Sequence, residues 1–174
     1  MKLFVGILGV FCALAMPVYA IEYVDSGGEK TFTITDYIAD YVDVPEGATD
    51  WQVFGTTKEI QIETTTDDGF DLMYYKPEFS EDLKALDGQE VTVKGYMFPL
   101  EGTESQNLFL FGPFPLTCPY QYHVGPSLVI EVHADGNPVK FSYDAVVITG
   151  VLELVPDDPE YSVFYRLRKA RQVE

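Results

Sequence analysis

Five short runs near the C-terminal end of the chain alternate apolar with polar side chains, and this period-two pattern constrains the fold more than any other feature. Stretches rich in Gly, Pro, Asn and Asp separate the runs and predict turns. Five short strands so close together predict a small barrel, because closing a sheet on itself removes its exposed edges. The runs lie at residues 89–96, 107–114, 127–134, 145–155 and 162–174.

The residues just before the first run predict a short helix. It covers residues 79–86, with Ser80 placed to cap its N-terminus and Asp87-Gly88 at its end. We therefore expect a mainly β chain, in which residues 79–174 form a five-stranded barrel resembling the oligonucleotide/oligosaccharide-binding (OB) fold.

Residues 21–78 are less regular and predict an N-terminal extension packed on the barrel. TFTIT at 31–35 and EIQIET at 59–64 alternate as strands do. Ile38, Tyr41 and Val42 have helical spacing, which predicts a further short turn of helix. No stretch rich in Pro, Gly or Ser divides the chain into two folding units.

The first twenty residues have the pattern of a secretory signal peptide. Lys2 precedes an uncharged apolar run at residues 3–15, and Pro17 and a terminal Ala20 follow it. A membrane helix needs about 20 apolar residues, so this run is too short to span. We expect residues 1–20 to be removed and the protein to be exported, to the periplasm or outside the cell, without a membrane span.

The charge of the chain excludes some partners. The chain has 11 basic and 28 acidic residues, a net charge of −17, and removal of residues 1–20 takes away only Lys2, which leaves −18. Nucleic acid binding draws its affinity from Lys and Arg, so an acidic protein of this kind is not expected to bind nucleic acid. The same charge disfavours anionic membrane surfaces.

The stretch TCPYQYHVGP at 117–126 is the candidate site. Cys118 is the only cysteine left after the predicted cleavage, and Tyr120, Tyr122 and His123 follow it between prolines. A single cysteine in an exported protein is buried and inert, bonded to another molecule, or reactive. The two tyrosines are the best candidates for exposed aromatic contacts to a ligand or partner.

A metal site is one alternative for this region. Cys118, His123 and His133 are the cysteine and histidine ligands of the mature chain, and Glu131 lies on the same strand face as His133. A closed zinc site usually has four such ligands, so three with a carboxylate would hold zinc or copper less completely. The main interpretation is a chain without a cofactor.

Catalysis by Cys118 is another alternative. A reactive thiol needs a lowered pKa, and no cationic residue neighbours Cys118 in the sequence, although His123 could approach it in space. No acid/base or nucleophile constellation stands out, so we do not expect an enzyme.

Two acidic clusters and one basic cluster have simpler interpretations. Residues 67–71 and 157–160 lack the spacing of a calcium loop and are interpreted as solvated turns. The basic residues of 166–171 either offset acidic neighbours, which we favour, or dock an acidic partner.

Several segments together resemble a family of exported bacterial proteins of unknown function. The most specific are LDGQEVTVKGYMFPL at 86–100 and the cysteine-proline stretch followed by GPS at 125–127, with WQVFG at 51–55 and VVITGVLEL at 146–154 in the same order. The resemblance implies an OB-like barrel in the bacterial envelope. Members of that family commonly have Cys or His three places after the first Cys, where this chain has Gln121, which weakens the metal alternative.

The sequence therefore predicts an exported, non-enzymatic binding or accessory protein of the envelope. It would present the loop 113–126 to an envelope protein or a small ligand. The alternative is a metal-handling protein that serves a transport system through Cys118 and His123.

Overall fold

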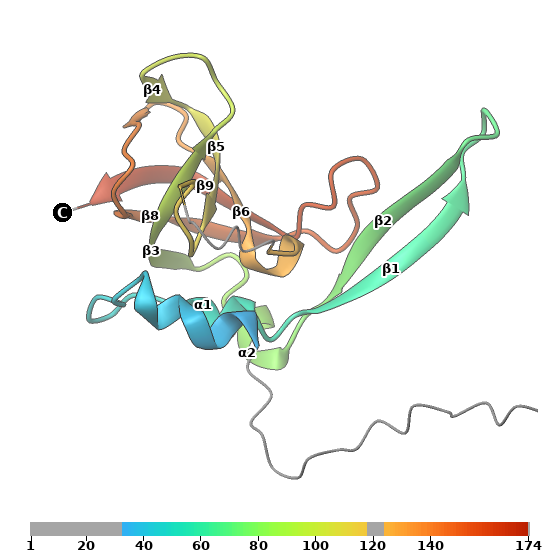
Figure 1. The fold of residues 1–174 in the computed structure, drawn as a ribbon, viewed down its shortest axis with the longest axis horizontal. Helices are drawn as coiled ribbons and strands as arrows, with labels where there is room; N and C mark the ends of the chain where they lie inside the picture. The colour runs from blue at the N-terminus through green and yellow to red at the C-terminus, as the bar shows by residue number, and fades with distance from the viewer. Residues whose placement is uncertain (1–32, 118–123, 174) are drawn as a thin grey trace, which may run out of the picture. The chain divides into compact units, whose positions relative to one another are not determined.

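The computed structural model describes residues 33–117 and 124–173, and its centre is a closed five-stranded barrel (Figure 1). The barrel order is β3-β5-β6-β9-β8, and neighbouring strands are antiparallel except for the parallel pair β6 and β9. This is the five-stranded Greek-key arrangement of the OB fold, so the predicted fold class is confirmed. The strands are β3 (Glu90–Pro99), β5 (Leu108–Gly112), β6 (Ile130–His133), β8 (Val146–Leu154) and β9 (Tyr165–Val173).

The barrel core follows from the alternation in the sequence. Val91, Val93 and Met97 of β3 point inward and are buried, while Thr92, Lys94 and Tyr96 are partly exposed. Gly95 lies within this strand, at a position where a Cβ would be 2.6 Å from the carbonyl oxygen of Gly112 on β5. The absence of a side chain lets the two backbones approach closely.

Two junctions, β3 with β8 and β6 with β9, close the barrel, and they differ in the number of paired residues. β3 and β8 pair over six residue positions, from Glu90 with Val151 to Gly95 with Val146. β6 and β9 pair at only two positions, Glu131 with Arg166 and Val132 with Leu167. The parallel seam is therefore the shorter closure.

Short helices cover the barrel and carry part of its core. α1 (Trp51–Phe54) buries Trp51 completely, and the indole Nε1 donates a hydrogen bond of 2.7 Å to the Lys94 carbonyl oxygen. The predicted helix at 79–86 is confirmed as α2 (Glu81–Lys84), where the Ser80 side chain accepts from the Leu83 N–H. η2 (Pro126–Leu128) leads into β6, and β4 (Ser105–Gln106) pairs with β7 (Val139–Lys140).

The prediction of a strand at 31–35 is wrong for the residues that the structure describes. Thr33 precedes a 3-10 helix, η1 (Ile34–Asp40), and the Asp36 carboxylate accepts the Thr33 N–H at 2.7 Å. This capping box favours a helix start over the alternation of TFTIT. Ile38 and Val42 are buried, as the helical spacing of the same region predicted.

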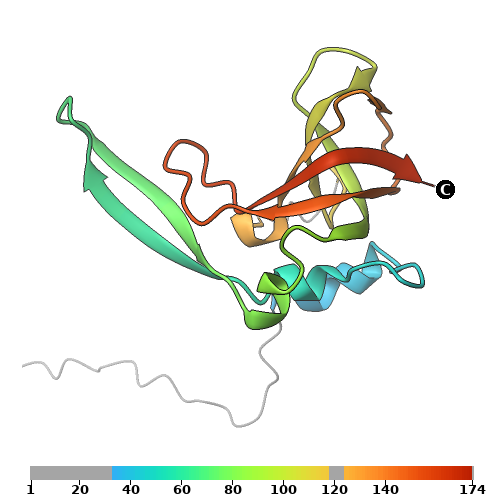
Figure 2. The ribbon, with the colours of Figure 1, turned by 180° about the vertical axis from the view of Figure 1, so that it is seen from behind.

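A two-stranded ribbon runs out from the barrel (Figures 1 and 2). It consists of the predicted strand β1 (Lys58–Thr65) and of β2 (Asp71–Glu78), which the sequence analysis did not predict. The acidic residues 67–71 are exposed in and beside the turn that joins them, where Gly69 has a φ of 82°. Their interpretation as a solvated turn is confirmed. None of the helices in 33–117 and 124–173 has the length and apolar character that crossing a bilayer requires.

Candidate functional site

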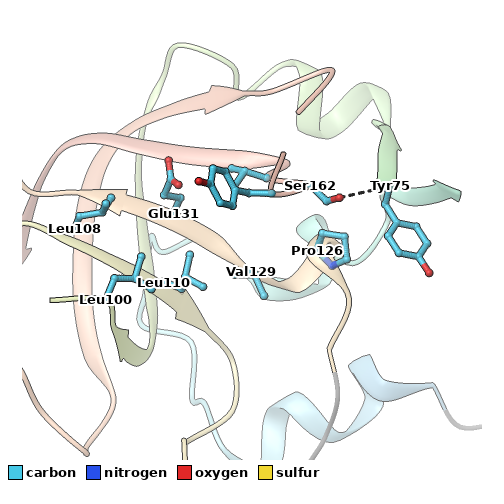
Figure 3. Close-up of a pocket in the computed structure, with 10 residues that line it drawn as sticks. Tyr75, Leu100, Leu108, Leu110, Pro126, Val129, Glu131 and Ser162 are labelled. Carbon is cyan, nitrogen blue, oxygen red and sulfur yellow. Dashed lines mark hydrogen bonds between the residues drawn. The ribbon is translucent and has the colours of Figure 1, made fainter. Parts of the chain in front are cut away.

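An apolar groove lies on the outer face of β5 and β6 (Figure 3). Phe109 and Phe111 of β5 point into the barrel and are fully buried, so the alternating residues Leu108 and Leu110 point outward into the groove. The groove has a volume of ≈ 590 Å³. Its lining residues are Tyr75, Leu100, Leu108, Leu110, Pro126, Val129, Glu131, Tyr161, Ser162 and Val163.

Two loops border this groove. Leu100 belongs to the connection between β3 and β5, and Tyr161 to the connection between β8 and β9. The face of the second and third barrel strands, flanked by these two connections, is where OB folds bind oligonucleotides and oligosaccharides. The position is therefore one that the fold is suited to use for ligands.

The loop between β8 and β9 is fixed by Asp158. Its carboxylate accepts hydrogen bonds from the backbone N–H groups of Glu160 and Tyr161, at 3.2 and 3.1 Å, and from Arg166 Nη2 at 3.1 Å. Tyr161 nevertheless keeps 72% of its surface exposed. A large aromatic ring is thus held at the groove edge by a backbone that is already ordered.

Ser162 joins this loop to the ribbon. It has a φ of 55°, in the left-handed region that residues other than Gly seldom adopt. Its Oγ accepts a 3.0 Å hydrogen bond from the Tyr75 N–H of β2, and its N–H donates to the Asp158 carbonyl oxygen at 2.9 Å (Figure 3). Strained backbone of this kind concentrates at ligand clamps and active sites.

One charged residue, Glu131, is among the ten that line the groove, and it is paired with Arg166. Glu131 Oε1 accepts from Arg166 Nε at 2.9 Å and lies 2.7 Å from His133 Nε2. Arg166 also contacts Asp158 and, at 3.7 Å, Glu153. The polar end of the groove is consequently a satisfied network.

The same network explains the basic cluster of the C-terminal strand. Arg168 Nε donates to Glu153 at 2.5 Å and holds the pKa of that carboxyl below its usual value. Arg171 pairs with Glu90 at 3.1 Å. The expectation that this cluster offsets acidic neighbours is confirmed for Arg166, Arg168 and Arg171.

A family model described as "Protein of unknown function (DUF3299)" matches residues 44–173. The chain belongs to the DUF3299 family. This confirms the predicted resemblance to a family of unknown function. Among solved structures, a DUF3299 family protein from Pseudomonas aeruginosa PAO1 is 23% identical, over 56% of this chain and 68% of that chain, with a TM-score of 0.44. A comparison with curated proteins gives no significant match.

Most residues of the predicted site in this DUF3299 chain lie outside the described residues, namely Cys118, Tyr120, Tyr122 and His123. The predicted loop 113–126 does reach the groove, because Pro126 is part of the lining. Glu59 of β1 holds this end of the loop, since its carboxylate accepts from the backbone N–H and the hydroxyl of Ser127. No sequence pattern predicted that Pro126 lines the groove or that Glu59 binds Ser127.

The metal alternative can be examined only at His133. The predicted proximity of His133 and Glu131 is confirmed, and it engages Nε2, one of the two ring nitrogens that can bind a metal. Within residues 33–117 and 124–173, no three His, Cys, Asp or Glu side chains are grouped as metal ligands. The set of Cys118, His123 and His133 remains a prediction.

Proposed function

We propose that this DUF3299 protein is a non-enzymatic binding protein of the cell envelope that holds an apolar ligand in the groove on β5 and β6. The observation that carries this proposal is the groove itself, whose walls are leucine, valine, proline and tyrosine side chains. Ligand sites in proteins are concave and mostly apolar, with volumes of roughly 300 to 1,000 Å³.

The fixed groove edge supports binding. Asp158 and Ser162 order the segment that presents Tyr161, so little conformational freedom remains to be lost when a ligand arrives. Exposed apolar side chains beside the groove, Leu100 and Tyr161, provide further contact area. A site prepared in this way binds more tightly than a flexible one of the same area.

The electrostatics of the groove support an apolar rather than an ionic ligand. Glu131 is paired with Arg166, which it shares with Asp158, and none of the ten lining residues is a cation that could bind an anionic group. The net charge of −17 disfavours nucleic acid, although OB folds often bind it. Apolar burial, worth about 25 cal/mol per Å², would supply most of the affinity.

The polar groups of the groove support a binding role over catalysis. The Ser162 hydroxyl accepts from Tyr75, and the Glu131 carboxylate accepts from Arg166, so both groups serve the structure. We further propose export to the periplasm, on the pattern of residues 1–20. The end of the loop 113–126 would then contact the ligand through Pro126, which forms part of the wall.

Fluorescence titration with the neutral probe N-phenyl-1-naphthylamine tests this function, using protein processed and recovered from a bacterial host. We expect one saturable site. Leu110→Gln places an amide in the groove wall and should weaken binding about tenfold, because burying a leucine contributes roughly 1.5 to 3 kcal/mol.

Tyr161 has a matched control elsewhere on the surface. Tyr143 is 70% exposed and lies outside the groove, against 72% for Tyr161. Tyr161→Ser should weaken probe binding several-fold, and Tyr143→Ser should leave it unchanged. Equal effects of the two variants, or binding that does not saturate, would contradict the proposed function.

A further inference from the structure

The outer edge of β2 has backbone groups that do not pair with β1. At the ribbon turn the Thr66 N–H donates to the Phe70 carbonyl oxygen at 2.8 Å, which makes these two residues a hydrogen-bonded pair. Hydrogen-bonded and non-bonded pairs alternate along antiparallel strands. Asp71, Met73 and Tyr75 are therefore non-bonded positions, whose N–H and C=O groups point away from β1.

The contact of Tyr75 supports this assignment independently. Its N–H donates to Ser162 Oγ and not to β1. Pro77, the next outward position, has no N–H. For Met73, which is 55% exposed, the described part of the chain provides no partner for the outward backbone groups. Such an edge can pair with another strand.

This edge leads into the groove. Tyr75 lines the groove, and Met73 lies two positions away on the same face of the ribbon. A strand added along Asp71 and Met73 would run toward Ser162 and bring its next side chains to the groove opening. The edge supplies hydrogen bonds and the groove supplies an apolar pocket, which are the two parts of strand-addition recognition.

The ribbon also carries negative charge that the fold does not balance. Both of its lysines are used, Lys58 with Glu78 and Lys76 with Asp157. Among the described residues, no Lys or Arg pairs with the remaining carboxylates of the strands and turn. These are Glu63, Asp67, Asp68 and Asp71, together with Glu59, which accepts from Ser127. Charge complementarity therefore favours a basic partner and opposes anionic lipid.

We propose that the outer edge of β2 binds an extended segment of a partner protein as a third strand, and that one face of this segment carries basic residues beside Asp71 and Glu63 and an apolar residue at the groove. This inference rests on the proposed function, because an apolar side chain of the segment enters the groove. Glu63 and Asp71 lie on the same ribbon face as Tyr75, so the basic and the apolar side chains of the segment belong to one face, at alternate positions along it.

A synthetic probe tests the proposal, the capped heptapeptide Leu-Thr-Leu-Thr-Lys-Thr-Lys, which has its leucines and lysines on one face and, in antiparallel pairing with β2, its leucines toward the groove. We expect it to bind the processed protein at least about tenfold more tightly than the same peptide with Glu in place of Lys. A version N-methylated at alternate residues cannot pair along one edge and should also lose about tenfold in affinity.

Two proline variants locate the binding edge. Met73→Pro removes an outward N–H from β2, and Gln61→Pro removes one from the opposite edge of β1, since Gln61 and Tyr75 form a non-bonded pair. Met73→Pro should weaken heptapeptide binding about tenfold, and Gln61→Pro should change it by less than about twofold. Circular dichroism establishes that both variants fold.

The outcomes separate this inference from the proposed function. If the wild-type protein shows no saturable binding of N-phenyl-1-naphthylamine, both the proposed function and the strand addition are overturned. Normal probe binding, together with heptapeptide binding that is insensitive to Met73→Pro, would overturn strand addition alone. If Met73→Pro unfolds the ribbon, the test is made on the wild-type protein with the unmodified and the N-methylated heptapeptide. Equal affinity of these two peptides would overturn the inference.

Discussion

Glu59 binds Ser127 twice, by accepting its backbone N–H at 3.0 Å and its hydroxyl at 2.6 Å. This pair joins the base of the ribbon to the short helix that contains Pro126. Gly125 makes room for it, because a Cβ at that position would overlap the Glu59 carboxylate. Gly125 has a φ of −76°, so the requirement for glycine is one of space and not of backbone conformation.

A double-mutant cycle tests this relationship. Gly125→Ala should displace the Glu59 carboxylate and lower the free energy of unfolding by about 1 kcal/mol, the usual contribution of such hydrogen bonds. In a Glu59→Ala background the same substitution should cost little. Denaturant unfolding of the four proteins measures the coupling, and additive costs would refute the explanation.

Gly95 and Gly102 should respond differently to alanine. A Cβ at Gly95 would meet the Gly112 carbonyl oxygen and the Phe111 ring, whereas a Cβ at Gly102 would meet nothing within 4 Å. Gly95→Ala should destabilise by about 2 to 3 kcal/mol through overpacking, and Gly102→Ala by less than about 0.5 kcal/mol. Chemical denaturation compares them, and similar midpoints would show that the strand contact at Gly95 relaxes freely.

Tyr165 should make stability depend on pH in alkaline solution. Burial raises the pKa of its phenol well above the ordinary value near 10, and the hydroxyl donates to the Phe54 carbonyl oxygen at 3.1 Å and lies 2.7 Å from Thr57 Oγ1. Because the folded state holds the proton more tightly, this stability is fully present below about pH 10 and declines as the pH rises further.

The substitution Tyr165→Phe should remove that alkaline slope. It should also lower stability at neutral pH by about 1 to 2 kcal/mol, because the Phe54 carbonyl and Thr57 hydroxyl lose their partner. Unfolding measured from pH 8 to pH 11 tests both effects, with exposed Tyr143→Phe as the control. An unchanged slope in Tyr165→Phe would assign the pH dependence to another group.

Arg166 and Arg171 provide a second matched comparison. The Arg166 side chain is largely buried between Glu131 and Asp158, whereas Arg171 is half exposed and pairs with Glu90. Arg166→Ala leaves two carboxylates without their cation and should cost about 2 kcal/mol. Arg171→Ala should cost less than about 0.5 kcal/mol. The rise in melting temperature caused by N-phenyl-1-naphthylamine would also be compared between Arg166→Ala and the wild-type protein. A smaller rise in the variant would show that the loop carrying Tyr161 has loosened.

The five barrel strands could be predicted because each buries one face, which produces the alternation that was observed. β2 could not, since its sequence DLMYYKPE has adjacent apolar residues and a proline, and its register is set by pairing with β1. Thr33 shows the opposite error, where a helix cap outweighed an alternating pattern.

The groove had only a faint signal in the sequence. Leu108 and Leu110 alternate with phenylalanines, so both faces of β5 are apolar, and an apolar outer face is what a binding surface requires. The sequence drew attention instead to 117–126, whose cysteine and aromatic residues stand out by type. The groove depends on Tyr75 and Tyr161, which are far apart in the chain and are brought together by the Ser162 hydrogen bond and the Lys76–Asp157 ion pair.

The two-position pairing of β6 with β9 has a consequence for motion. It joins a three-stranded unit, β3, β5 and β6, to the hairpin of β8 and β9, while the other junction has six positions. The barrel should open at this seam first, and the amide protons of Glu131 and Leu167, which face the seam, should exchange with solvent sooner than those of Val93 and Ile148, a bonded pair between β3 and β8. A molecule bound over Glu131 and Val163 would bridge both units and slow that opening, which makes hydrogen exchange a readout of occupancy even for a ligand without a chromophore.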